Sequence, residues 1–570
     1  MLHKDFLDRV DVGFAWGLIE SFATQPREQP DDANRGAELI AERLKSAGIP
    51  VTMHRPTLFL SLPGPASVEI GGQRYFAKPP AFSASVPEGV TAPMEYFSPT
   101  KREFARHQKL DPNRFRGKIV VTEGISLPML TSEIEEMGAL GIIATNPGEL
   151  IHWSTASTIW GTPDVEDMNR LPKVPSLAVN RTDGVAVLAA AKRGEKTTIR
   201  AELKQGWFPQ NLPVVHIEGA IEPDRFVFLH GHYDSWQVGV GDNGTGNACM
   251  VEIARVLWEQ RKSLRRSVRL AWWPAHSTGR YGGSVWYLDQ HAMDFAKNCV
   301  MHMNCDSPGC RWATEYTSIT MMPETVKSVT QVVERVTGQT PEPKRPNRSS
   351  DYTFYNIGIS GAFMASSMMP KDEVEKRGWH HVGGCGGNIA WHTEADTYEV
   401  ADKGVLKKDV ELYLEAVVTF ANAEILPLDF RDSVKEIAAT AEGYRKSAGT
   451  RFDLSDVTQA LSKLEAKVGA FYEAVAAKKF APRAANDAMR DLSRALVPLN
   501  YALRGPFQQD PAVTLPPVPL LSIAADLDVF DKDSIGFALA TLLRGRNAAL
   551  AAIDGAAMAI ERVSARCGPA

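Results

Sequence analysis

Residues 206–425 alternate short apolar runs with segments of helical periodicity, and this alternation constrains the fold more than any other feature. The apolar runs include Phe226–Leu229 and Val268–Trp273, and the helical segments include Gly246–Gln260 and Ser284–Phe295. Strands that alternate with helices tend to pair in parallel, with the helices covering both faces of the sheet. We therefore expect an α/β, three-layer domain with a mixed, largely parallel sheet, whose active groups gather at the carboxyl ends of the strands.

The flanking regions differ from this domain in composition and in the pattern of apolar residues. Residues 58–205 carry short β-rich runs and one helical segment, whereas residues 426–570 are rich in Ala, Leu, Lys and Glu. Near residues 35–50 an amphipathic helix is expected, closed by a Gly and a Pro and followed by a strand. We predict an α/β domain at 1–57 and 206–425, an inserted β-rich domain at 58–205 and a C-terminal helical domain at 426–570.

The composition argues against several classes of function. The chain has 570 residues, 23% of them charged, and a formal net charge of -5, which gives no support to nucleic-acid binding. The N-terminus has acids where a signal peptide has a basic region, and no apolar run reaches the ~18–20 residues of a membrane span. We expect a soluble, cytoplasmic protein with no membrane partner. Six cysteines without CxxC spacing favour free thiols.

Histidine and acidic residues follow the predicted strands. His232 and Asp234 come after the first strand, Asp242 precedes a helix, and Asp306 and His392 belong to two later segments. We expect His232, Asp242, Asp306 and His392 each to end a separate element of one sheet. The imidazole of His232 and the carboxylate of Asp242 can meet on one cation. Asp234 is placed to hold the ring of His232, as metal-bound histidines usually require. Taken alone, an Asp beside Gly-Thr-Gly is more often an N-cap or turn residue.

The order of these motifs resembles the zinc aminopeptidases and glutamate carboxypeptidases. The chain reads His-x-Asp, Asp-Asn-x-x-Gly, Trp-x-Ala, Asn-x-Asp-Ser and finally Trp-His-Thr-x-x-Asp-Thr. Residues 58–205 resemble a protease-associated domain. Leu426–Asp432 and Leu496–Leu499 resemble the helical dimerisation domain of prostate-specific membrane antigen and the transferrin receptor. The resemblance implies a homodimer, an inserted domain that caps the site, and one or two divalent metal ions per chain, preferably zinc.

The resemblance also implies individual ligands. Asp242 would bridge two metal ions, His232 and Asp306 would complete the first, and His392 would bind the second. These four residues are present. The first ion would then have one imidazole, two carboxylates and an open position, which is the pattern of a catalytic ion.

This chain departs from the resembled family at two adjacent glutamates, which serve there as general base and metal ligand. The positions are occupied by His276 and Ser277. Serine removes a negative charge and a strong oxygen ligand, so the second metal ion should weaken or vanish. Three interpretations of His276 stay open: a base that activates water, a ligand of the second ion, or an inert residue. Its position favours the first two.

Four further residues are candidates for substrate contact or support. Asp351 matches a loop whose acid supports the active site in the resembled family, and its alternative role is a helix N-cap. Tyr281 is a candidate for the pocket wall, although core packing explains it equally well. His380 and His381 lie on a Gly-rich loop and are candidates for substrate or metal contact, with an ordinary surface loop as the favoured alternative.

These observations predict a metal-dependent hydrolase of an amide-type bond in a peptide or small molecule. One alternative is a non-peptidase enzyme of the same fold, such as a deaminase, cyclase or lyase that uses one metal ion and His276. Another is an inactive, receptor-like scaffold. Ordinary peptidase activity is expected to be weak, because position 276 lacks the glutamate base. The substrate does not follow from the sequence, since one fold supports many functions.

Overall fold

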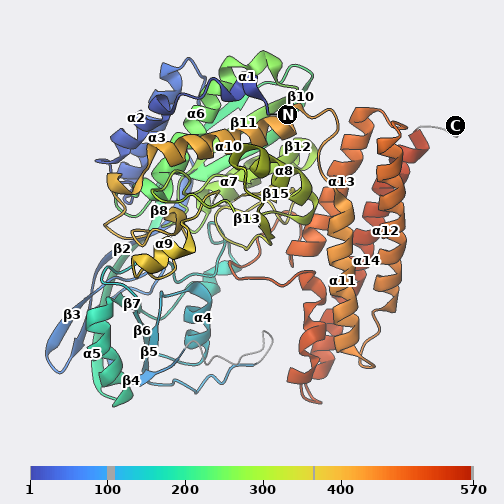
Figure 1. Cartoon of the computed structure of the whole chain (residues 1–570). Coiled ribbons are helices and arrows are strands. Elements are labelled where there is room, and N and C mark those ends of the chain that lie inside the picture. The colour runs from blue at the N-terminus through green and yellow to red at the C-terminus, as the bar shows by residue number, and fades with distance from the viewer. Residues whose placement is uncertain (1, 99–108, 364–365, 567–570) are drawn as a thin grey trace.

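A six-stranded mixed sheet carries the predicted site (Figure 1). The structure is a computed structural model that describes residues 2–98, 109–363 and 366–566. The strand order is β1-β9-β11-β10-β12-β15, with parallel pairing from β11 to β15 and antiparallel pairing of β1 and β9. The strands are β1 (Thr52–His54), β9 (Leu212–Ile217), β11 (Arg266–Trp273), β10 (Glu222–His232), β12 (Cys299–Asn304) and β15 (Gly361–Ala362).

Both faces of this sheet are buried under helices, which confirms the expected three-layer α/β fold. In β10, Val227 and Leu229 join one apolar cluster, whereas Phe226 and Phe228 join another on the opposite face. Strands buried on both faces read as continuous apolar runs, which is why the sequence revealed them. The first face is covered by α2 (Val12–Phe22), α3 (Pro30–Ser46), α6 (Thr245–Glu259) and α10 (Lys403–Asn422), and the second by α7 (Gly282–Asn298).

The N-terminal helix α3 ends where the sequence predicts. A proline stands in its first turn with Asp31 and Asp32, and Arg43 and Lys45 stand in its last turn. These charges match the positive amino end and negative carboxyl end of the helix. Gly48 then takes a positive φ of 74°, and β1 follows. The predicted helix near residues 35–50 and the strand after it are therefore confirmed.

A seven-stranded sheet forms the lower left of Figure 1. Its β2 and β8 pair in a long antiparallel ladder, and β4 to β7 pair in parallel. The β-rich runs and the helical segment expected within residues 58–205 include β5, α4, β6 and β7. The elements are β2 (Thr57–Ile70), β3 (Gln73–Ala77), β4 (Val86–Tyr96), β5 (Ile119–Glu123), α4 (Pro128–Glu136), β6 (Gly141–Thr145), β7 (Ser176–Val179), α5 (Arg181–Lys192) and β8 (Lys196–Pro209).

Long helices at the right of Figure 1 form the C-terminal part of the chain. They are α11 (Phe430–Ala448), α12 (Ser455–Ala476), α13 (Pro482–Tyr501) and α14 (Ile535–Arg566). None of the described helices combines the length and apolar character that a bilayer span requires. The remaining elements are α1 (Lys4–Leu7), β13 (Ser318–Thr320), α8 (Val326–Thr337), β14 (Glu342–Lys344) and α9 (Lys371–Lys376).

Five of the six cysteines are buried free thiols. This matches the expectation for Cys249, Cys299, Cys305, Cys310 and Cys385. Cys567 lies outside the described residues. The thiols therefore contribute mainly as small apolar side chains.

Candidate active site

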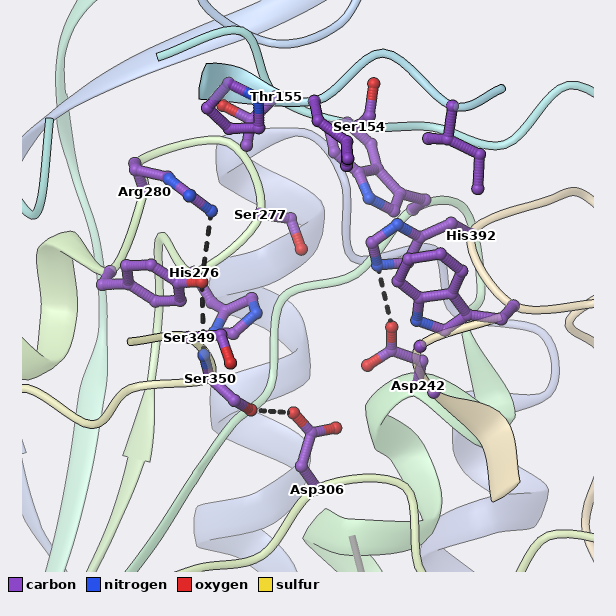
Figure 2. A pocket seen from close by; sticks show the side chains of 18 of the residues that line it. Ser154, Thr155, Asp242, His276, Ser277, Arg280, Asp306, Ser349, Ser350 and His392 are labelled. Atoms are coloured by element: carbon purple, nitrogen blue, oxygen red, sulfur yellow. Dashed lines mark hydrogen bonds and ion pairs between the residues drawn. The ribbon is translucent and has the colours of Figure 1, made fainter. Parts of the chain in front are cut away.

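The four residues predicted as metal ligands converge at one edge of the central sheet. Figure 2 shows three of them, Asp242, Asp306 and His392. Asp242 lies between two histidines: its Oδ1 is 3.1 Å from His232 Nε2, and its Oδ2 is 3.0 Å from His392 Nε2. The Oδ1 of Asp306 is 3.6 Å from the same nitrogen of His232. The carboxylate of Asp242 is thus placed to bridge two cations, one on each side.

Not all four residues end a strand, which corrects one expectation. His232 is the last residue of β10, and Asp306 comes two residues after β12. Asp242 instead lies in an irregular turn directly before α6, and His392 lies in a loop with a positive φ of 57°. Apolar periodicity locates strands and helices but carries no signal for loops that fold back to a sheet edge.

The environment of His232 fits a cation. Its Nδ1–H donates to the backbone carbonyl of Asp234 at 2.8 Å, which turns Nε2 toward the carboxylates. This Nε2 is buried and makes no hydrogen bond of normal geometry to any described residue. Burial alone lowers the pKa of His232, but Asp306 and Asp242 more than offset this and raise it well above its ordinary value. One imidazole and two carboxylates are suitable donors for zinc.

Asp234 does not hold the ring of His232 through its carboxylate, contrary to expectation. Its two carboxylate oxygens accept the backbone N–H groups of His276 and Ser277, each at 2.9 Å. The ring of His232 is held by the backbone carbonyl of Asp234 instead. Asp234 therefore positions the loop of His276 and Ser277.

His276 stacks on His232, with ring centroids 3.8 Å apart and an interplanar angle of 12°. Its Nδ1 lies 2.6 Å from Oδ2 of Asp351, whose other oxygen accepts the hydroxyl of Ser284 at 2.6 Å. Burial raises the pKa of Asp351, but His276 more than offsets this and lowers it. An ionised Asp351 accepts the N–H of His276 at Nδ1, so the lone pair of the neutral ring is on Nε2. Candidate ligand atoms of His232, His276 and Asp306 all lie within 4.8 Å of one another.

Ser277 stands where the resemblance predicts a metal-binding carboxylate. Figure 2 shows its hydroxyl pointing into the space between His276 and His392. Across the described parts of the chain, His392 joins no cluster of three acidic, histidine or cysteine ligands. The second side of Asp242 therefore offers one imidazole, a shared carboxylate and a neutral hydroxyl.

The loop that carries His392 is attached to the seven-stranded-sheet region. The Nδ1–H of His392 donates to the carbonyl of Trp153 at 2.8 Å, and the N–H of Trp153 donates to the carbonyl of His392 at 2.7 Å. The Nδ1–H of His152 donates to the carbonyl of Trp391 at 2.6 Å. Sequence reasoning missed His152 and Trp153, because nothing along the chain relates them to residues about 240 positions away.

Two further residues beneath the site were also missed. Asp396 accepts the backbone N–H groups of Gly241 and Asp242 at 2.6 and 2.9 Å, and burial raises its pKa to about 7. Arg27 is fully buried and donates to the carbonyls of Tyr233 and Gly239 at 2.6 and 2.8 Å. Burial lowers the pKa of Arg27 to about 10, while nearby acids including Asp396 oppose this change. Asp396 belongs to the last sequence motif, whereas Arg27 has no local signal.

A cavity of about 370 Å³ opens above these residues. The seven-stranded-sheet region contributes Ile125–Pro128, Ser154 and Thr155 to its wall, as expected of an inserted cap. Tyr281 also lines it. The other lining residues are Trp236, Asp242, His276, Ser277, Arg280, Asp306, Ser307, Asn347, Ser349, Ser350, Gly383, Gly384, Trp391 and His392.

His380 and His381 do not line this cavity, which argues against substrate or metal contact there and agrees with the favoured alternative of an ordinary loop. His380 Nε2 lies 2.9 Å from His152 Nε2 and borders a separate cavity of about 610 Å³. His381 is exposed. The glycines Gly383 and Gly384 of the same loop are the ones that face the site. The backbone turns at this Gly-rich segment, so His380 and the two glycines border different cavities.

A bridging aspartate between two histidines, at the edge of a three-layer α/β sheet, is the arrangement of a metallopeptidase-type domain. Residues 214–417 match the model of Peptidase family M28. The match confirms the predicted resemblance to zinc peptidases.

The curated relatives match only parts of the chain. Carboxypeptidase Q from Mus musculus is 28% identical over 177 residues, which cover 30% of this chain and 37% of that protein. Transferrin receptor protein 1 from Gallus gallus is 38% identical over 96 residues, which cover 16% of this chain and 12% of that protein. The matches thus span well under half the length of these relatives.

Solved structures agree with the fold. An aminopeptidase from Aneurinibacillus sp. strain AM-1 superposes with a TM-score of 0.55 at 18% identity, covering 73% of this chain and 95% of that one. BSAP, a zinc aminopeptidase from Bacillus subtilis, gives a TM-score of 0.53 at 20% identity, covering 72% and 94%. At these identities the likeness establishes the fold alone.

Proposed function

We propose that this protein is a metal-dependent hydrolase of an amide-type bond, in a peptide or a small molecule, with an atypical active site. The observation that carries the proposal is the position of Asp242 between His232 and His392, with Asp306 beside His232. Four candidate ligand side chains gathered around Asp242 are more than an inactive scaffold needs. The match of residues 214–417 to the model of Peptidase family M28 supports the same class of reaction.

The ligand groups support one strong cation position and one weaker one. His232, Asp242 and Asp306 would hold a divalent cation, preferably zinc, because imidazole and carboxylate are its usual donors in catalytic sites. Such a cation polarises an amide carbonyl and makes water more acidic. His392 and Asp242 would hold a second cation weakly, since Ser277 adds no negative charge.

His276 is suited to move the proton in this reaction. Asp351 accepts the Nδ1–H of its ring at 2.6 Å, so Nε2 is left to accept a proton from the attacking water. The buried carboxylate then stabilises the imidazolium, and Nε2–H can donate to the leaving amine. Ser284 keeps Asp351 in place by donating to its other oxygen. His276 would replace the glutamate base of the resembled family.

The His276–Asp351 pair also favours a second candidate, a non-peptidase enzyme of the same fold. A histidine held by a buried carboxylate can serve as acid or base in a deaminase, cyclase or lyase as well as in a hydrolase. The two candidates differ in product. Hydrolysis releases an amine and a carboxylic acid, and the other reactions do not release both.

The test uses the full-length protein with its metal content measured by elemental analysis. Native protein, His276→Ala, and the double variant His276→Glu with Ser277→Glu are compared on a peptide panel and on small amides. We expect weak native cleavage of ordinary peptides and turnover of small amides that His276→Ala lowers about 100-fold or more. Strong peptidase activity that survives His276→Ala would reject the proposed role of His276. Absence of any amine product would reject hydrolysis.

We also propose a homodimer formed through residues 426–570. Three large apolar side chains of α14, namely Phe537, Leu543 and Met558, are 77%, 43% and 40% exposed. Aromatic residues and methionine are enriched in the cores of subunit interfaces. Light scattering at micromolar concentration should give twice the chain mass. A monomer mass would reject the proposal.

A further inference from the structure

Arg280 contributes a cation to the wall of the site cavity. Among the lining residues that the structure describes, the other ionic side chains besides histidines are Asp242 and Asp306. Arg280 follows His276 by four positions, on the loop between β11 and α7. Figure 2 shows its side chain entering the cavity opposite His392. A fixed positive charge therefore faces the position where a substrate of this site would lie.

The guanidinium of Arg280 is poorly satisfied by the protein itself. Its Nη1–H donates to the hydroxyl of Tyr281 at 3.1 Å, and no carboxylate of a described residue lies within ion-pair distance. Its Nε–H is buried without an acceptor. The buried Arg27, in contrast, donates to two backbone carbonyls at 2.6 and 2.8 Å. Most of the five N–H groups of Arg280 are thus without a described protein acceptor.

Tyr281 adds a second donor without a partner. Its hydroxyl oxygen accepts from Arg280 Nη1 and from the backbone N–H of Ser350 at 3.2 Å. The hydroxyl donates to no residue in the described parts of the chain. With both oxygen lone pairs occupied, its proton remains for a ligand. Arg280 and Tyr281 together form a donor pair that requires an acceptor, preferably an anionic one.

The backbone fixes the direction of this donor pair. Arg280 and Tyr281 have positive φ values of 49° and 70°, which non-glycine residues adopt only when their surroundings hold them. The carbonyl of Arg280 accepts from Gly161 N–H at 2.6 Å, and Trp160 stacks on the ring of Tyr281 at 3.9 Å. Residues from the seven-stranded-sheet region therefore lock the loop with its donors turned into the cavity.

The donor pair is close to the candidate metal ligands. Ser350 donates through its N–H to Tyr281 and through its hydroxyl to Asp306, so a short hydrogen-bond chain joins the two sites. The ring of Tyr281 also contacts His276 edge-on at 4.8 Å between centroids. If Arg280 holds an anionic group of the substrate, a substrate bond a few atoms from that group would lie beside His276 and Asp306.

The size and walls of the cavity limit the rest of the ligand. A volume of about 370 Å³ is near the lower end of small-molecule sites, which span about 300–1,000 Å³. Ile125, Leu127, Pro128 and Trp391 supply apolar surface. A ligand that fits these features has a carboxylate, an amide a few atoms from it, and an apolar group of modest size.

We propose that Arg280, with the hydroxyl of Tyr281, binds a carboxylate of the substrate, so that the protein selects small amides such as N-acyl amino acids and apolar dipeptides with a free carboxylate. This inference rests on the proposed amide hydrolysis for its catalytic part. Recognition of the carboxylate is a separate property, which binding can measure without turnover.

The test compares N-hexanoylphenylalanine with its C-terminal amide, using metal-loaded full-length protein. Arg280→Gln should lower kcat/KM for the acid at least about tenfold, mainly through KM, and should leave the amide nearly unchanged. Arg280→Lys keeps the charge and should recover part of the loss. Arg311→Gln is the control, because Arg311 lines the neighbouring cavity. An equal loss for acid and amide would show a structural role and overturn the inference.

Calorimetric binding of the same acid and amide separates the two proposals. Preferential binding of the acid that Arg280→Gln removes, without any hydrolysis, would support carboxylate recognition and reject the proposed function. Equal hydrolysis of the acid and the amide would overturn carboxylate recognition and leave the proposed function intact. The same holds if Arg280→Gln leaves hydrolysis of the acid unchanged. Absence of both binding and hydrolysis of the acid would overturn the inference.

Discussion

The two sides of Asp242 are built from different parts of the molecule. On the first side, His232 and Asp306 follow neighbouring parallel strands of the central sheet, β10 and β12. On the second side, His392 lies on an irregular loop whose backbone pairs with Trp153 of the seven-stranded-sheet region. The first side is therefore a property of the core sheet, whereas the second depends on contact between two regions of the chain.

The difference is also chemical. The first side combines an imidazole, two carboxylates and the nearby ring of His276, whereas the second has His392, a shared carboxylate and the hydroxyl of Ser277. Cation affinity rises with the number of charged ligands and with the rigidity of the elements that carry them. We expect the first side to bind a cation more tightly and to lose it less readily when distant residues change.

Asp242→Ala should have the largest effect, because this residue serves both sides. We expect more than about 100-fold weaker zinc binding, since even changes to groups behind the ligands typically cost 10–100-fold. Elemental analysis and zinc titration measure this loss. Asp372→Ala, on the exposed face of α9, is the control. Unchanged zinc stoichiometry would contradict the assignment of both sides.

Asp351→Asn should affect the reaction and leave the cation in place. The amide cannot hold the Nδ1–H of His276 as an ionised carboxylate does, so we expect kcat to fall about 100-fold or more. Zinc content should stay unchanged, because Asp351 touches His276 and Ser284 and none of the four predicted ligands. Loss of zinc together with activity would instead make His276 a ligand of the first side.

His152→Phe tests whether the second side depends on the distant region. The change removes the hydrogen bond to the carbonyl of Trp391 beside His392. We expect about tenfold weaker binding of a second cation and little change for the first. Stepwise zinc titration separates the two events, with His381→Ala on the exposed part of the same loop as control. Equal weakening of both sides would contradict the comparison.

Asp409→Asn should give the smallest effect, confined to stability. Asp409 lies on α10 and accepts the N–H of Gly309 at 2.6 Å and the hydroxyl of Ser367 at 2.7 Å, both on one oxygen, which an asparagine can retain. Burial raises the pKa of Asp409 from 3.8 to about 6, so the folded state holds its proton more tightly than the unfolded state. The native protein therefore loses stability as pH rises through about 6.

The measurement for this variant is the free energy of unfolding at pH 5 and pH 7. The native protein should lose about 1–2 kcal/mol more than Asp409→Asn over this range. Zinc affinity of the first side should be unchanged. An equal pH dependence in both proteins would contradict the assignment to Asp409.

The same contrast explains what the sequence could predict. Apolar runs identified β10 and β11, and residues next to strand ends, such as His232 and Asp306, could be placed because parallel strands end at one edge. The direction of a side chain within a turn is not encoded by periodicity, which is why the carboxylate of Asp234 was assigned to the wrong partner.

Residues that act through distant contacts could not be predicted from one sequence. Trp153 and His152 reach the loop of His392 across about 240 positions, and Arg27 reaches the turn near Gly239 across 212. Hydrogen bonds of this kind depend on the completed packing of separate regions. Arg280 had no signal either, since a single arginine beside an aromatic residue is common on protein surfaces.

The buried Arg27 has a consequence for how this protein can be shortened or recombined. The family match covers residues 214–417. The guanidinium that donates to the carbonyls of Tyr233 and Gly239 nevertheless belongs to Arg27, and the carbonyl that accepts from His392 belongs to Trp153. A fragment cut at the limits of the family match would expose unpaired carbonyls in the turn that leads to Asp242. Exchange of this domain between relatives would therefore have to carry these two outside residues with it.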